Sequence, residues 1–158
     1  MGSYFFTRTN NFNYFRWFCF CYDGNVSCKY SRQYKILNSM NYTEELLQKA
    51  DEIIPRVSLK EFQNDSNAKV MIDVRQLDEL QASGSIKGSL HIPKGVIEFR
   101  LNNNDDINFD TSVYVFCAVG IRSAIAGYNL KKIGYKKVYN LKGFQDILDQ
   151  GAEKKFLS

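Results

Sequence analysis

The sequence predicts an α/β fold with a mainly parallel β-sheet flanked by helices. Two apolar runs, 70–74 and 113–116, lack the alternation of polar and apolar residues that marks a strand with one face in water. Such runs are typical of parallel strands that are covered on both faces. Helix-forming stretches separate the predicted strands, as in βαβ units. Five extended segments are expected to form the sheet: 54–57, 70–74, 89–92, 112–116 and 137–141.

The helices of the first half are predicted from their end signals. Thr43 precedes several helix-forming residues and is the expected N-cap of the first helix. Ser58 and Glu61 have the spacing of a capping box, which predicts that the second helix begins at Ser58. A short third helix over 76–83 is expected to end at Gly84, because glycine favours helix termination.

The second half contains three more predicted helices. A short helix is expected over 95–101, after Pro93 has ended the preceding strand. Asparagine and aspartate dominate 102–111, which is therefore interpreted as a loop. The fifth helix, over 123–133, is expected to stop at a glycine, and a last helix over 144–150 closes the domain.

The segment that follows the predicted strand 112–116 carries the residues best suited to chemistry. Cys117 lies at the carboxyl end of this strand, where α/β sheets bind their ligands. Backbone N–H groups and the dipole of the following helix would favour a thiolate there. Because the thiolate is the nucleophilic form, Cys117 is predicted to be catalytic. The alternative is a buried cysteine that only fills space at a strand end.

The rest of this loop is predicted to bind the substrate. Its backbone N–H groups can stabilise a developing negative charge, as an oxyanion hole does. The guanidinium of Arg122 adds donors that suit an anion. The predicted substrate-binding residues are Ala118, Val119, Gly120, Ile121, Arg122 and Ser123.

Four segments, in this order along the chain, resemble the rhodanese-like family of sulfurtransferases over about residues 54–151. They are Val70–Arg75, Gly84–Pro93, Cys117–Ser123 and Val138–Gly143. The resemblance implies a rhodanese-like fold and transfer of sulfane sulfur, from a donor such as thiosulfate, through a persulfide on Cys117. It also implies that the sulfur donor is a small molecule and that the acceptor is a thiol, a cyanide-like compound or a protein. No metal or organic cofactor is implied.

Three departures from the family pattern lie outside the Cys117 loop. Ser85 replaces the usual histidine, Phe144 stands where a second glycine is common, and Ile147 stands where many members carry tryptophan. Because none of them is in the loop, they bear on local packing more than on chemistry.

Two other classes of function stay open. Phosphatases and arsenate reductases of this fold also combine a cysteine with an arginine, but their loop is one residue longer. Four residues separate Cys117 from Arg122, and this shorter ring suits a single sulfur atom better than a phosphate. A non-catalytic sulfur-carrier or interaction module is the other alternative, and the presence of both residues argues against it.

Polar residues near the predicted strand ends receive supporting roles. Asp73 is expected to tie down a loop near the site, and Arg75 to pair with an acid such as Asp78 or Glu79. Arg100, in a helix that lies beside the pocket in similar proteins, is a further candidate for anion binding. A plain surface position explains this arginine equally well.

Charge and cysteine content limit the partners. The net charge of +4 comes entirely from residues 1–39, since basic and acidic residues are equal in number from Met40 onward. The domain therefore gives no support for a nucleic-acid partner. His91 is the only histidine, which argues against a metal site and suggests a packing role. A single domain cysteine, Cys117, excludes an internal disulfide and favours a reducing compartment such as the cytoplasm.

Residues 1–39 are predicted to be separate from the domain at 40–158. They are rich in aromatic residues and asparagine, and they show no sustained helical or strand period. This extension is expected to be disordered, or to be a leader or misassigned start ahead of Met40; an organellar presequence is the second choice. Its apolar stretch, 17–22, is too short to span a bilayer, so no membrane segment is expected.

Overall fold

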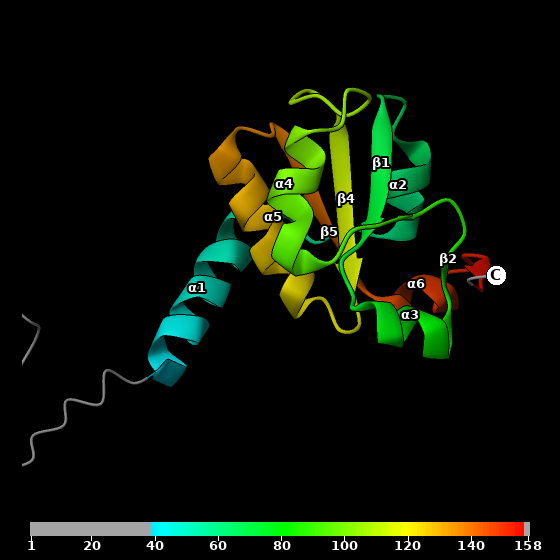
Figure 1. Ribbon diagram of the computed structural model, residues 1–158, viewed down its shortest axis with the longest axis horizontal. Helices are drawn as coiled ribbons and strands as arrows, with labels where there is room; N and C mark the ends of the chain where they lie inside the picture. Colours follow the sequence, from blue (N-terminus) through cyan, green and yellow to red (C-terminus); the bar gives the residue numbers. More distant parts are fainter. Residues whose placement is uncertain (1–38, 157–158) are drawn as a thin grey trace, which may run out of the picture. The chain divides into compact units, whose positions relative to one another are not determined.

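A computed structural model describes residues 39–156, and its centre is a four-stranded parallel sheet between helices (Figure 1). The strand order is β3-β1-β4-β5, and each neighbouring pair is parallel. These strands are β1 (Lys69–Asp73), β3 (Leu90–His91), β4 (Ser112–Cys117) and β5 (Lys137–Gly143). The predicted α/β class is therefore confirmed, and all four strands end at the same edge of the sheet.

The expected fifth strand is reduced to a single bridge. Arg56 pairs in parallel with Asn140 of β5, flanked by hydrogen bonds from Val57 N–H to the carbonyl of Asn140 and from Asn140 N–H to that of Pro55, at 2.9 and 3.0 Å. Pro55 has no N–H to donate, and Ser58 already caps the next helix, so the pairing cannot extend in either direction.

A second, small sheet lies outside the sequence-based prediction. Strand β2 (Ser85–Ile86) pairs antiparallel with β6 (Lys154–Lys155), close to the C-terminus. Each strand has only two residues and shows no period that could be recognised in the sequence. Its formation depends on the tertiary approach of two distant segments.

The helices divide between the two faces of the central sheet. One face is covered by α1 (Ser39–Ile53), α4 (Ile97–Asn102) and α5 (Ile121–Ile133), and the other by α2 (Leu59–Asn64) and α6 (Phe144–Asp149). Helix α3 (Leu77–Ser83) follows β1, and a short 3₁₀ turn (Lys94–Val96) precedes α4. None of the helices within 39–156 is long and apolar enough to cross a membrane.

Helix ends confirm most of the sequence signals and correct one. Ser58 and Glu61 form the predicted capping box at the start of α2. Gly134, at a φ of 125°, ends α5 as expected. Thr43 is not an N-cap, because α1 begins four residues earlier and includes it. The predictions made for 1–38 lie outside the described residues.

Strand β4 contributes to both hydrophobic cores because its side chains alternate between the faces. Val113 and Val115 pack under α1, α4 and α5, whereas Tyr114 and Phe116 pack under α2 and α6. The whole strand is buried, which explains its continuous apolar sequence. Cys117 is the last residue of this strand, so its backbone is held by the most buried element of the fold.

We expect Phe116→Ala to reduce the free energy of unfolding by about 3–5 kcal/mol, because it removes a wholly buried ring between β4 and α6. Urea unfolding followed by circular dichroism measures this loss. Phe99→Ala is the matched control, since that ring is 72% exposed on α4, and its effect should stay within about 0.5 kcal/mol. Similar losses in the two variants would contradict the core assignment.

Candidate active site

The candidate site is built around Cys117 Sγ at the carboxyl edge of the sheet. The chain turns from β4 into α5 within three residues, and this turn brings backbone donors to the sulfur. Gly120 N–H donates a hydrogen bond to Sγ with an N–S distance of 3.1 Å. The Ser123 hydroxyl, in the first turn of α5, lies 3.6 Å from the same sulfur. Both donors and the cysteine are buried.

The surroundings of Cys117 favour its thiolate. Burial by itself raises the pKa of the thiol, because the charged form loses its hydration. Hydrogen bonds from the hydroxyl and backbone N–H of Ser123, and from the N–H groups of Val119 and Gly120, lower it by more. The result is a Cys117 pKa below its usual value, as a nucleophilic cysteine requires.

Asn140, a buried residue of β5, fixes the loop from behind. Its Oδ1 accepts from the Ser123 hydroxyl at 2.8 Å and from Lys142 N–H at 2.9 Å, and its Nδ2 donates to the Gly120 carbonyl at 2.9 Å. The Ser123 hydroxyl has one proton, so Asn140 and the sulfur compete for it. The sequence signal for this residue is a polar side chain inside the apolar run of β5.

Close contact between the loop and β5 requires an unusual backbone at both. Gly120 has a φ of 91°, and a Cβ built there would lie 3.1 Å from Lys142 Cα. Lys142 has a φ of 70°, the one positive value at a non-glycine residue within 39–156. Phe144 N–H also donates to the carbonyl of Ala118 at 3.2 Å. The loop is thus held in one shape by the end of β5.

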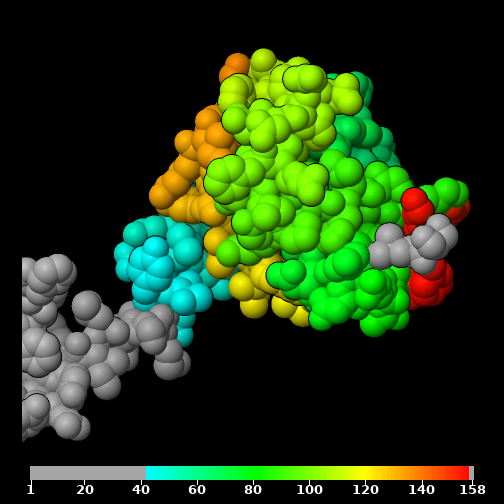
Figure 2. Space-filling view, in the orientation of Figure 1, coloured from blue at the N-terminus to red at the C-terminus, as the bar shows by residue number. Residues whose placement is uncertain are grey.

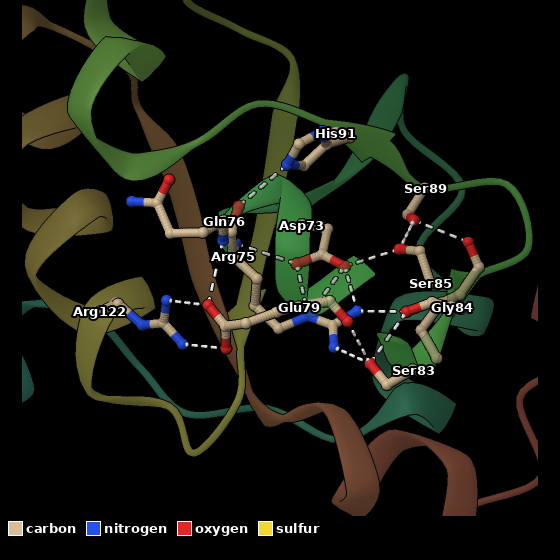
Figure 3. A network of polar contacts seen from close by, with 11 residues as sticks. Asp73, Arg75, Gln76, Glu79, Ser83, Gly84, Ser85, Ser89, His91 and Arg122 are labelled. Atoms are coloured by element: carbon tan, nitrogen blue, oxygen red, sulfur yellow. Dashed lines mark hydrogen bonds and ion pairs between the residues drawn. The ribbon is translucent and has the colours of Figure 1, made fainter. Parts of the chain in front are cut away.

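Arg122 pairs with Glu79 of α3, as Figure 3 shows. Its two terminal nitrogens donate to the two carboxylate oxygens at 2.6 and 2.7 Å. Glu79 also accepts from Gln76 N–H at 3.1 Å, so the carboxylate is held at the start of α3. The hydrogen bond from Arg122 is the main reason that the pKa of Glu79 falls to about 2.

Arg75 pairs with an acid, as predicted, but that acid is Asp73 and not Asp78 or Glu79. Asp73 accepts from the Arg75 guanidinium at 2.7–3.1 Å, and both side chains are buried (Figure 3). The reason is the turn after β1, which folds the arginine back over its own strand end while α3 directs Glu79 to Arg122. Asp73 does tie down a neighbouring segment, because its carboxylate also accepts from Ser85.

The departures from the family pattern fit around this buried pair. Ser85 donates to Asp73 at 2.6 Å, and its hydroxyl lies 3.0 Å from that of Ser89. The Phe144 ring covers the Arg75 guanidinium with 3.9 Å between the ring centre and Cζ, a cation–π geometry. Two of the three unusual residues therefore stabilise the same ion pair. Ile147, the third, is wholly buried beside them in the core under α2 and α6.

Arg100 belongs to a different part of the surface. It is exposed in the last turn of α4 and lines a hollow of about 860 Å³ with His91 and the loop 103–106. Figure 2 shows the face of the molecule on which α4 and the segment before it, in green, lie at the surface. Among the described residues that line the hollow, none belongs to the Cys117 loop. His91 also contacts the turn after β1, since its Nε2 lies 2.9 Å from the carbonyl oxygen of Arg75.

Some of the curated relatives carry names from sulfur chemistry. The protein of Bacillus subtilis named "Putative sulfur carrier protein YrkF" is 37% identical over 91 residues, covering 56% of this chain and 47% of that protein. The chain thus spans about half the length of this relative. A sulfurtransferase of Allochromatium vinosum is 33% identical over 86 residues, covering 54% of this chain and 77% of its own.

Solved structures show the same fold. The polysulfide-sulfur transferase homodimer from Wolinella succinogenes superposes with a TM-score of 0.61 at 26% identity, covering 77% of this chain and 93% of that one. A Rhodopseudomonas palustris protein described as a possible tyrosine phosphatase gives 0.59 at 25% identity, covering 72% and 93%. The family model described as "Rhodanese-like domain" matches residues 56–147, from the bridge at Arg56 to α6. The chain therefore belongs to the rhodanese-like family.

Proposed function

We propose that this protein transfers sulfane sulfur through a persulfide on Cys117. The observation that carries the proposal is the pair of donors that meet at Sγ near the start of α5: Gly120 N–H, and the Ser123 hydroxyl, which the sulfur shares with Asn140. Donors in this arrangement stabilise a negative sulfur, whether it is the thiolate or the outer atom of a persulfide. The sulfurtransferase names of the relatives support the same chemistry. The reaction requires no metal or organic cofactor.

In the first step, the Cys117 thiolate attacks the outer sulfur of a donor such as thiosulfate. A bond forms between Sγ and that sulfur, the S–S bond of the donor breaks, and its electron pair leaves with sulfite. No net proton is consumed, because thiolate and thiosulfate give persulfide anion and sulfite. The lowered pKa of Cys117 supplies the reactive form without a separate general base.

In the second step, an acceptor removes the outer sulfur. Cyanide or a thiolate attacks it, the persulfide S–S bond breaks, and the electron pair returns to Sγ. The acceptor leaves as thiocyanate or as a new persulfide, and the thiolate is restored. A protein thiol is a further acceptor that would react in the same way. The side chains of Val119 and Ile121 are exposed and give the loop an apolar rim to which such a protein would bind.

A sulfur-carrier role is the second candidate, and the name of the Bacillus subtilis relative favours it. A carrier forms the same persulfide but releases its sulfur only to a specific partner. Turnover distinguishes the two roles: an enzyme consumes many equivalents of thiosulfate when cyanide is present, whereas a carrier stops after one.

Cys117→Ser should abolish thiosulfate:cyanide sulfurtransferase activity while leaving the circular dichroism spectrum unchanged, because serine fits the same space at the end of β4. After incubation with thiosulfate, mass spectrometry of the wild-type protein should find one added sulfur atom on the peptide that contains Cys117. The peptides of the extension, with Cys19, Cys21 and Cys28, serve as internal controls. Sulfur transfer by the serine variant would refute the proposal.

Ser123→Ala should raise the pKa of Cys117, because a donor to the thiolate is lost. Below that pKa the rate of alkylation by iodoacetamide should fall roughly threefold to tenfold, whereas well above it the two proteins should react equally. The measurement is the rate of modification of the Cys117 peptide as a function of pH. Ser112→Ala, a buried serine at the other end of β4, is the control and should leave the profile unchanged.

The size of the loop predicts negligible hydrolysis of aryl phosphates by the wild-type protein. Only four residues separate Cys117 from Arg122, one fewer than in the phosphatase loops, so the ring has little room for a tetrahedral phosphate. The assay compares p-nitrophenyl phosphate hydrolysis with sulfur transfer at equal enzyme concentration. Phosphate release at a rate comparable to sulfur transfer would favour the phosphatase class instead.

A further inference from the structure

Glu79 already accepts hydrogen bonds from the guanidinium of Arg122 in the Cys117 loop. Both terminal nitrogens of Arg122 donate to it in a symmetrical fork, at 2.6 and 2.7 Å (Figure 3). The pair is about one-third exposed on each side, so it lies at the surface of the site and a donor molecule can reach it. An arginine in this position would otherwise present a full positive charge to an incoming anion.

The ion pair stays intact wherever the Cys117 thiolate forms. The pKa of Glu79 is about 2, so its carboxylate is ionised throughout the neutral range. Arg75, which also acts on Glu79 electrostatically, is itself neutralised by Asp73. The hydrogen bond to Glu79 is the main cause that raises the pKa of Arg122, and Cys117 adds to that rise, so the guanidinium is shared between the carboxylate and the sulfur. The largest contributions that lower the pKa of Cys117 come from N–H and O–H dipoles of Ser123, Val119 and Gly120.

We propose that Glu79 makes the Cys117 loop selective for sulfur donors with a single negative charge, such as organic persulfides and thiosulfonates, over the thiosulfate dianion. This inference rests on the sulfur transfer proposed above. It assigns a specificity-determining role to a residue of α3 that was expected from the sequence only as an ion-pair partner.

The physical reason is the place of the second charge. The sulfur under attack lies against Sγ, where Gly120 and Ser123 stabilise one negative charge in any of these donors. The sulfonate of thiosulfate carries its other charge further out, towards the rim of the loop. There it meets a guanidinium whose field Glu79 cancels, and it is repelled by the carboxylate itself.

Two donors isolate this effect because they differ in charge and react alike. Thiosulfate carries two negative charges, and methanethiosulfonate has a methyl group in place of one oxygen and carries a single charge. In both reactions the Cys117 thiolate forms a bond to the outer sulfur and the S–S bond of the donor breaks. The electron pair leaves with sulfite from the first donor and with methanesulfinate from the second, so atoms and charge balance.

The experiment compares kcat/KM for the two donors, with cyanide as acceptor, in the wild-type protein and in Glu79→Gln. Glutamine also suits the capping position at the start of α3 and can still accept a bond from Arg122, so the helix should be kept. We expect the ratio of thiosulfate to methanethiosulfonate to rise about tenfold in the variant, and the gain to shrink with added salt. The intrinsic reactivities of the donors cancel in this change of ratio.

Asp78→Asn is the matched control, since it removes one negative charge from the adjacent, exposed residue of the same helix turn. Its ratio should change by less than about twofold. An unchanged ratio in Glu79→Gln, or an equal loss of activity with both donors, would overturn the selectivity role and leave Glu79 a structural residue. A wild-type protein that takes sulfur from neither donor would instead refute the proposed sulfur transfer.

Discussion

The geometry of the site depends most on the hydrogen bonds of the Asn140 side-chain amide. One side chain bonds the Gly120 carbonyl, the Ser123 hydroxyl and the Lys142 backbone, so it joins the loop, the start of α5 and the end of β5. Its own backbone pairs with the segment before α2. Because the amide is buried, its oxygen and nitrogen need partners in the folded state, and the loop has little freedom to adopt another shape.

The two arginine ion pairs in and near the loop differ in their exposure to solvent, and this difference determines their roles. Arg75 and Asp73 are fully buried. Such a pair adds little net stability, since both charges must first lose their water, and its main effect is to hold the two side chains in one arrangement. Arg122 and Glu79 are partly exposed, so water reaches them. The first pair is a buried part of the scaffold, and the second lies at the surface, where we propose that it acts on the choice of sulfur donor.

The unusual residues of this chain form a coherent local solution. A histidine in place of Ser85 would offer a larger, titratable donor to Asp73. Here the small hydroxyl of Ser85 donates to that carboxylate, and the Ser89 hydroxyl lies within hydrogen-bond distance of the Ser85 hydroxyl. Phe144 then covers the opposite side of the pair at Arg75. These substitutions keep Asp73 hydrogen-bonded without introducing a group that titrates near neutral pH.

The sequence by itself determined the parallel sheet, the capping box of α2, the end of α5 at Gly134 and the position of Cys117 between a strand and a helix. Each of these depends on local propensity or on neighbours in the chain, so it can be recognised from short patterns. Only the tertiary structure decided that Arg122 pairs with Glu79, 43 residues away, that Arg75 turns back to Asp73, and that β2 and β6 meet near the C-terminus. The choice among several acids of equal charge depends on distances across the fold, and the sequence pattern does not contain those distances.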